Sequence, residues 1–336
     1  MNKFLPEYDF FTTENIYKAW LRFKNGKKYK QDVTDFELNL ISNLKNLRDD
    51  LISNSYVHGK YYSFTIVEVK KREIHKASVR DRVVHHLLYD SLYKYFDNKF
   101  IYDSYSCRKD KGTHKALERY KSFLTKSSDN FTKQAYILKF DIQKCFASID
   151  HSVLKNILYK HIQDKDILNL LNKILDSHIS NDQESIKKVG IPLGNLTSQL
   201  FINIYLNELD FYCKHVLKLK YYIRYADDVI IILKKEESTH KYENKATEIV
   251  SKVDLFCKAN LKLNIHKVEM KTINSGVDFL GWVHFSKYRV LRKVTKRKML
   301  ETVNKKNVTS YLGLLKWGNG YKLNIKLLKL SESREN

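Results

Sequence analysis

The segment 222–233 constrains the fold of this chain more than any other stretch of its sequence. Two short runs rich in β-branched and aromatic residues flank the adjacent acidic residues Asp227 and Asp228, a pattern that predicts strand, tight turn, strand. Both runs are apolar enough to be buried, so the turn would carry two negative charges side by side. Like charges held this close repel each other and favour a bound cation, for which Mg²⁺ is the natural candidate.

A third acidic residue, Asp141, ends the apolar run 136–141 and lies well before this hairpin in the sequence. Antiparallel pairing of that run beside the hairpin would bring Asp141 to the turn that carries Asp227 and Asp228. Three carboxylates so placed could hold two Mg²⁺ ions. The alternative is that Asp141 is only a turn residue at the end of a strand.

The charge of the chain predicts a polyanionic partner. There are 61 Lys and Arg residues against 38 Asp and Glu residues, which gives a formal net charge of +23. Nucleic acid is the first choice for such a partner. An AT-rich genome would raise the number of Lys codons, but it would raise Asn equally and does not explain the net charge.

The four cysteines argue against zinc and disulfide chemistry. They lie far apart and form no C-x-x-C pair. The first residues lack the apolar core of a signal peptide, and no run approaches the length of a transmembrane helix. We therefore expect a cytoplasmic, reduced protein with no membrane partner.

Apolar periodicity predicts an α+β chain, with helices on one face of a small antiparallel sheet. Ser78 and Asp150 are expected to cap the helices that follow them. Helices are expected at 15–23, 35–52, 78–96, 152–161, 165–175, 198–218 and 243–259, and strands at 61–69, 70–74, 136–141 and 261–265.

The tetrapeptide Tyr-Ala-Asp-Asp at 225–228 resembles the signature of reverse transcriptases, and other segments resemble the motifs of that family in the same order. These segments are 72–86, 103–112, 137–151, 190–199, 261–267, 278–282 and 310–319. The resemblance implies an RNA-directed DNA polymerase with a right-hand fold: fingers, a palm with antiparallel sheet and helices, and a short helical thumb. The expected divisions are an N-terminal helical extension at 1–59, fingers and palm at 60–284, and a basic thumb with tail at 285–336.

The resemblance also implies roles for individual residues. The implied metal ligands for two Mg²⁺ ions, with Mn²⁺ as a possible substitute, are Asp141, Ile142, Asp227 and Asp228. The implied nucleotide-binding residues are Lys70, Arg72, Phe146, Leu193 and Gly194. The implied template- and primer-binding residues are Ser198, Gln199, Gly281, Trp282, Arg292, Lys296 and Arg297.

Two of the implied roles have ordinary structural alternatives. Phe146 matches the steric gate that excludes a 2′-hydroxyl and selects deoxynucleoside triphosphates, but it could equally be a core aromatic. Lys267 matches the residue that protonates leaving pyrophosphate, but it could equally be a solvated lysine. The expected partners are an RNA template, the RNA–DNA hybrid and deoxynucleoside triphosphates.

The segment 190–199 separates subtypes of the family. Most group II intron enzymes have Gln before Gly194 and Pro after Ser198, whereas this chain has Leu193 and Gln199. These residues resemble the error-prone enzymes of diversity-generating retroelements, which implies a small basic accessory protein as a further partner. We expect no added endonuclease or maturase domain. The alternatives are a bacterial anti-phage, retron or group II intron-like reverse transcriptase, or an RNA-binding assembly factor with dispensable catalysis.

Overall fold

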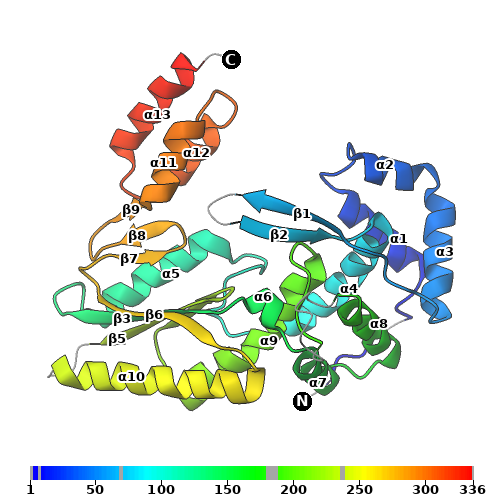
Figure 1. The fold of residues 1–336 in the computed structure, drawn as a ribbon, viewed down its shortest axis with the longest axis horizontal. Coiled ribbons are helices and arrows are strands. Elements are labelled where there is room, and N and C mark those ends of the chain that lie inside the picture. The colour runs from blue at the N-terminus through cyan, green and yellow to red at the C-terminus, as the bar shows by residue number, and fades with distance from the viewer. Residues whose placement is uncertain (1–2, 7–8, 68–70, 179–187, 235–238, 335–336) are drawn as a thin grey trace.

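The structure, a computed structural model, describes the chain except for residues 1–2, 7–8, 68–70, 179–187, 235–238 and 335–336. Helices pack on antiparallel sheets, which confirms the predicted α+β class. The largest sheet has four strands. Figure 1 shows it low in the molecule, with a β-hairpin and a group of C-terminal helices above it. Within the described residues, no helix is long and apolar enough to cross a membrane.

The four-stranded sheet has the order β4-β5-β3-β6, with every neighbouring pair antiparallel. Its strands are β3 (Ala135–Ile142), β4 (Tyr222–Tyr225), β5 (Asp228–Lys234) and β6 (Ile265–Thr272). In β5, Val229 and Ile231 belong to one hydrophobic cluster, while Ile230 and Ile232 belong to another on the opposite face. Because both faces of β5 are covered, its sequence is a continuous apolar run rather than an alternating one.

Helices therefore cover both faces of this sheet, where the sequence predicted only one. One face packs against α9 (Leu196–Phe211) and α10 (Thr239–Phe256), and the other against α5 (Gly112–Ser127). Helix α9 continues into a short π-helical segment, η1 (Tyr212–Val216), and α10 continues into another, η2 (Cys257–Leu261). The predicted strand at 261–265 is wrong. Leu261 is the last residue of η2, and β6 begins only at Ile265.

The N-terminal half forms helices, from which an exposed β-hairpin of β1 (Tyr62–Val67) and β2 (Lys71–Lys76) projects (Figure 1). The helices are α1 (Thr13–Lys24), α2 (Gln31–Leu38), α3 (Leu40–Ile52), α4 (Val79–Asp97), α6 (Cys145–Ser148), α7 (His151–His161) and α8 (Lys165–Asp176). The single helix expected at 35–52 is broken at Asn39, whose backbone leaves the helical region. The predicted caps are confirmed, since Ser78 accepts a hydrogen bond from the third residue of α4 and Asp150 accepts two from the start of α7.

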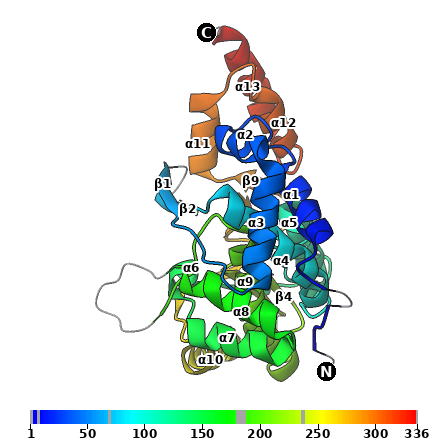
Figure 2. The same cartoon turned by 90° about the vertical axis from the view of Figure 1, so that its right-hand side faces the viewer.

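The C-terminal part is a small sheet followed by three helices. A three-stranded antiparallel sheet, β7-β8-β9, packs with α5 in the second hydrophobic cluster. Figure 2 shows the helices rising from this sheet to the far end of the molecule. The elements are β7 (Val277–Phe279), β8 (Trp282–His284), β9 (Arg289–Leu291), α11 (Lys293–Thr302), α12 (Val308–Leu315) and α13 (Tyr321–Ser333).

Candidate functional site

Backbone pairing brings the three acidic residues singled out in the sequence to one end of the four-stranded sheet. Asp141 at the end of β3 pairs directly with Asp228 at the start of β5. The turn between β4 and β5 contains Ala226, whose φ of +54° is unusual for a residue other than glycine. The Ile142 amide donates a hydrogen bond of 3.2 Å to the Asp227 carbonyl, which ties this turn to β3. The carboxylates of Asp141, Asp227 and Asp228 line one cavity.

The electrostatics of these carboxylates fit a divalent cation. Burial raises the pKa of Asp227, and the negative charges of Asp228 and Asp141 raise that pKa further. The Oδ1 atom of Asp141 is buried and has no hydrogen-bond partner, an uncommon state that a cation would relieve. In the part of the chain that the structure describes, no three acidic, His or Cys side chains already enclose a metal position. The three carboxylates thus suit a Mg²⁺ site in which the phosphates of a substrate supply the remaining ligands.

Two lysines place positive charge at the rim of this cavity, which has a volume of about 550 Å³. The Nζ atom of Lys139 lies 3.6 Å from Asp228 and donates a 2.9 Å hydrogen bond to the Asp278 carbonyl. The sequence reasoning missed Lys139, although it lies two residues before Asp141 on a strand and therefore on the same face. The Nζ atom of Lys267 lies 3.5 Å from Asp141 Oδ2.

A β-bulge directs Lys267 toward the carboxylates. The register between β3 and β6 shifts between Lys139 and Asp141, and Lys267 has a φ of +49°. Bulges redirect side chains and are enriched next to active sites. Over half of the Lys267 side chain is exposed, so its ammonium group is free to meet a ligand in the cavity.

A second cavity of about 760 Å³ adjoins the first, because Arg72 of β2 lines both. Phe146 and Leu193 line this second cavity and come from segments that are far apart in the sequence. Both residues are expected to contact a nucleotide. The Leu193 carbonyl accepts a 2.8 Å hydrogen bond from the His75 amide, which ties this loop to the β1–β2 hairpin. Lys70, the other basic residue expected here, lies outside the described residues.

Gly194 brings the β2 strand close to this loop, in addition to the nucleotide contact expected of it. Its φ is +111°, and a Cβ atom there would lie 2.7 Å from Cγ2 of Ile74. The absence of a side chain at Gly194 therefore lets the β2 strand approach this loop closely.

A buried ion pair is hydrogen-bonded to the turn between β4 and β5. The sequence patterns did not predict this ion pair. Arg224 and Asp210 are both fully buried. Their side chains form two hydrogen bonds, of 2.8 and 2.7 Å. Arg224 Nη1 also donates a 3.1 Å hydrogen bond to the Ala226 carbonyl inside the turn. This network links α9 to the backbone that presents Asp227.

The residues expected to bind template and primer fall into two groups. Ser198 and Trp282 are each only 1% exposed, so direct contact of either side chain with nucleic acid is not available in this structure. Ser198 also does not open its helix, because α9 begins at Leu196 after Asn195. Trp282 packs in the core of the β7–β9 sheet.

The remaining template and primer candidates are accessible. Arg292 lines the cavity of the carboxylates and forms an ion pair with Asp278. Gly281 turns the chain between β7 and β8 with a φ of +86°. Lys296 and Arg297 are exposed on α11, and Gln199 is half-buried in α9.

Comparison with known proteins supplies the family. The family described as "Reverse transcriptase (RNA-dependent DNA polymerase)" matches residues 68–284. The COX1/OXI3 intron 2 protein of Saccharomyces cerevisiae is 25% identical over 321 residues, which cover 77% of this chain and 36% of that protein. The group II intron-encoded protein LtrA of Lactococcus lactis is 29% identical over 152 residues, which cover 45% of this chain and 24% of LtrA. The chain thus matches about a third or less of the length of these two relatives.

A solved structure has the same fold. The telomerase of Candida albicans, determined with a fragment of telomeric RNA, aligns over 82% of this chain and 55% of its own, with a TM-score of 0.52 and 12% identity. That similarity confirms the predicted right-hand polymerase fold. The family match covers well over half of the chain and includes all three acidic residues. This chain belongs to the reverse transcriptase (RNA-dependent DNA polymerase) family.

Proposed function

We propose that this chain is an active RNA-directed DNA polymerase that synthesises cDNA on an RNA template. The observation that carries the proposal is the strand register that sets Asp141 against Asp228, beside Asp227. These three carboxylates and the adjacent Ile142 would hold two Mg²⁺ ions, with Mn²⁺ as a possible substitute. Bound Mg²⁺ would supply an activated primer 3′-hydroxyl and stabilise the charge that develops on the phosphates.

Basic residues around the carboxylates have roles in binding and proton transfer under this proposal. Arg72 lies between the two cavities and would bind the phosphates of the incoming nucleotide by charge-assisted hydrogen bonds. Lys267 would donate a proton to the leaving pyrophosphate, because its ammonium group already lies beside Asp141. Arg292, Lys296 and Arg297 would follow the backbone of the RNA–DNA hybrid, which is recognised through its phosphates and shape.

The proposed domains are the three divisions of the chain expected from the sequence. Residues 60–284 would form fingers and palm, because both cavities lie almost entirely within them. Residues 285–336 would form the thumb, which carries exposed Lys and Arg residues on α11. Residues 1–59 would be a helical extension whose buried side chains pack on α4.

Phe146 is proposed to exclude ribonucleotides. Its ring is half-buried and lines the cavity shared with Arg72 and Leu193. For Phe146→Val, we expect the preference for deoxy- over ribonucleoside triphosphates to fall by about 10- to 200-fold, the scale of discrimination that small volume changes in an apolar pocket produce. Single-nucleotide incorporation with each substrate measures this preference. The conservative Phe146→Tyr variant should retain it, and a preference that survives in Phe146→Val would contradict the assignment.

We further propose that the enzyme is error-prone and belongs to a diversity-generating retroelement. Support comes from Leu193 and Gln199, which stand where group II intron enzymes carry Gln and Pro. Leu193 lines the cavity that Arg72 and Phe146 also line, where an aliphatic side chain would offer no hydrogen bond to a nascent base pair. A small basic accessory protein would be a further partner.

Sequencing of cDNA tests the subtype. For Leu193→Gln, we expect fewer substitutions opposite template adenines, by about fivefold if one hydrogen bond of about 1 kcal/mol is gained. The assay uses the RNA encoded beside this gene, with the neighbouring small protein added. Leu38→Gln, at an exposed position in α2, is the matched control and should leave the error spectrum unchanged.

The competing proposal is an intron-type enzyme, and it is favoured by the intron-encoded relatives. Accurate cDNA from the wild-type chain would contradict the error-prone subtype and favour the intron-type, retron or anti-phage alternative. Polymerase activity itself would then still stand. A chain that binds RNA but synthesises no DNA would instead point to an assembly factor.

A further inference from the structure

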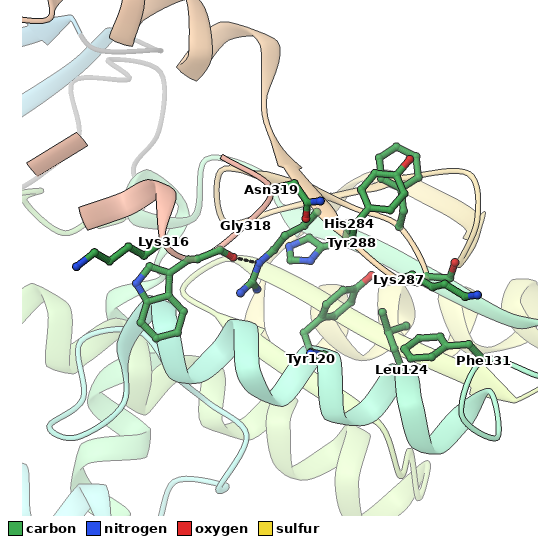
Figure 3. Close-up of a pocket in the computed structure, with 14 residues that line it drawn as sticks. Tyr120, Leu124, Phe131, His284, Lys287, Tyr288, Lys316, Gly318 and Asn319 are labelled. Atoms are coloured by element: carbon green, nitrogen blue, oxygen red, sulfur yellow. Dashed lines mark hydrogen bonds between the residues drawn. The ribbon is translucent and has the colours of Figure 1, made fainter. Parts of the chain in front are cut away.

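A third cavity lies outside the catalytic cavities, between α5, the β8–β9 turn and the segment that follows α12. Figure 3 shows Tyr120 rising from α5 toward His284, with Lys287 and Lys316 at opposite ends. The cavity has a volume of about 290 Å³. Sites for small ligands span about 300–1,000 Å³, so this one has room for a single base rather than a duplex.

Aromatic rings make up much of its wall. Tyr120, Phe131, Phe285, Tyr288 and Trp317 all line the cavity. The rings of Phe285 and Tyr288 are stacked, with centroids 4.8 Å apart, and about half of Tyr288 is exposed. An aromatic surface that is rigid and accessible is the usual platform on which single-stranded bases stack.

Two buried polar side chains also line the cavity. Tyr120 is 1% exposed, and burial raises the pKa of its hydroxyl, which therefore stays protonated near pH 7 and can donate a hydrogen bond into the cavity. Burial lowers the pKa of His284 to about 4, so its imidazole is neutral near pH 7. One ring nitrogen of His284 lies 3.3 Å from the Phe279 carbonyl, which leaves the other nitrogen available as an acceptor.

The charge of the lining is entirely positive. Lys121, Lys287, Arg289 and Lys316 line the cavity, and none of its described lining residues is acidic. Lys287 and Lys316 are exposed, so their ammonium groups can reach the phosphates on either side of a bound nucleotide. Cations around stacked rings are the combination that single-stranded nucleic acid requires.

This cavity is separate from the catalytic cavities, yet close to them. It shares no lining residue with either. Arg292 lines the cavity of the three carboxylates and lies at one end of the β7–β9 sheet. His284 and Arg289 line the third cavity and pair with each other at the opposite end of that sheet. Strands of three residues span about 10 Å, so an RNA strand could continue from one site to the other.

We propose that this cavity holds one nucleotide of single-stranded RNA, stacked on Tyr288 and hydrogen-bonded to Tyr120. It is a second RNA contact beyond the catalytic cleft. It rests on the proposed RNA partner but not on catalysis, so a chain carrying Asp227→Asn binds RNA there as the wild type does. Failure of polymerase activity and failure of this site are therefore separate results.

The test uses a short single-stranded RNA of mixed sequence that carries thiouridine and a fluorescent label. The full chain with Asp227→Asn is first saturated with an RNA–DNA hybrid, which fills the catalytic cleft. Fluorescence anisotropy then measures binding of the labelled RNA, and mass spectrometry maps its photo-crosslinks. We expect retained binding and crosslinks to peptides that contain Tyr120 or Tyr288. Tyr288→Ala should weaken binding by about fivefold or more, the size of one lost stacking contact.

Matched variants separate stacking from loss of folding. Tyr288→Phe keeps the ring and should bind like the parent chain, whereas Tyr120→Phe keeps the core ring and should weaken binding through the lost hydroxyl. Tyr29→Ala removes another exposed tyrosine beside a lysine and should have no effect. The proposal is overturned if Tyr288→Ala binds like Tyr29→Ala, if the hybrid displaces all the labelled RNA, or if crosslinks map only to the catalytic cavities.

Discussion

Replacing Asp227 by Asn is expected to reduce cDNA synthesis by about a thousandfold or more. The amide has nearly the shape of the carboxylate but lacks its charge, so it holds Mg²⁺ poorly. Metal ions contribute several kcal/mol of charge stabilisation in the transition state, and each 1.36 kcal/mol corresponds to a tenfold change in rate. Primer extension on an RNA template measures the effect. Residual synthesis within tenfold of the wild type would contradict the assignment of Asp227 as a metal ligand.

The same substitution should stabilise the chain when no metal is present. Burial and two neighbouring carboxylates raise the pKa of Asp227 in the folded state. A raised pKa of an acid means that the folded state binds more protons than the unfolded state between the two pKa values, so stability falls as pH rises through this window. Above the folded-state pKa this loss is complete. At pH 7, Asp227→Asn removes the buried charge and should therefore raise the melting temperature.

Added Mg²⁺ provides the control for both effects. It should raise the melting temperature of the wild type, because a ligand that binds only the folded state stabilises that state. It should raise the melting temperature of Asp227→Asn much less. Asp254→Asn changes a carboxylate on α10 whose ion pair with Lys258 lies on the helix surface, and it should respond to Mg²⁺ like the wild type. An equal response of all three proteins would place the metal elsewhere.

Breaking the buried pair of Arg224 and Asp210 is expected to have the second-largest effect. Arg224→Met would leave the Asp210 carboxylate buried without its partner, which costs about 3–5 kcal/mol in comparable pairs. Denaturation in urea measures the free energy of unfolding. Arg22→Met is the matched control, because Arg22 pairs with Asp90 at a position where over half of its side chain is exposed. That control should cost no more than about 1 kcal/mol.

A second substitution separates folding from positioning of the turn. Arg224→Met combined with Asp210→Leu removes both charges, and apolar replacement of a buried pair is often neutral. The double variant should recover part of the lost stability. It should still synthesise cDNA poorly, because the hydrogen bond from Arg224 to the Ala226 carbonyl is gone. A double variant that is stable and fully active would show that this pair does not position Asp227.

Much of the site could be predicted from local sequence patterns. Apolar runs around the adjacent Asp227 and Asp228 specify a buried hairpin, because residue type and turn chemistry act over a few neighbouring residues. The apolar run before Asp141 likewise specifies a strand. The pairing between them was a hypothesis that the structure confirms, with Asp141 directly opposite Asp228.

Other features of the site could not be predicted, because they depend on segments far apart in the chain. Asp210 is an ordinary helix residue in the sequence, and only the packing of α9 under the hairpin places it against Arg224. Lys267 lies beside Asp141 because a bulge in β6 shifts the strand register, and no local pattern marked that bulge.

The sequence by itself determined the α+β class, the family and the three acidic residues, because motif order and hydrophobic periodicity are properties of the chain alone. Tertiary structure decided which motif residues face solvent. Ser198 and Trp282 belong to segments that resemble template- and primer-binding motifs, but both side chains are buried. Burial depends on what packs against a residue: α9 is covered along much of its length, and Gly318, in the segment after α12, packs against the ring of Trp282. That information is distributed over the whole fold and is absent from any single motif.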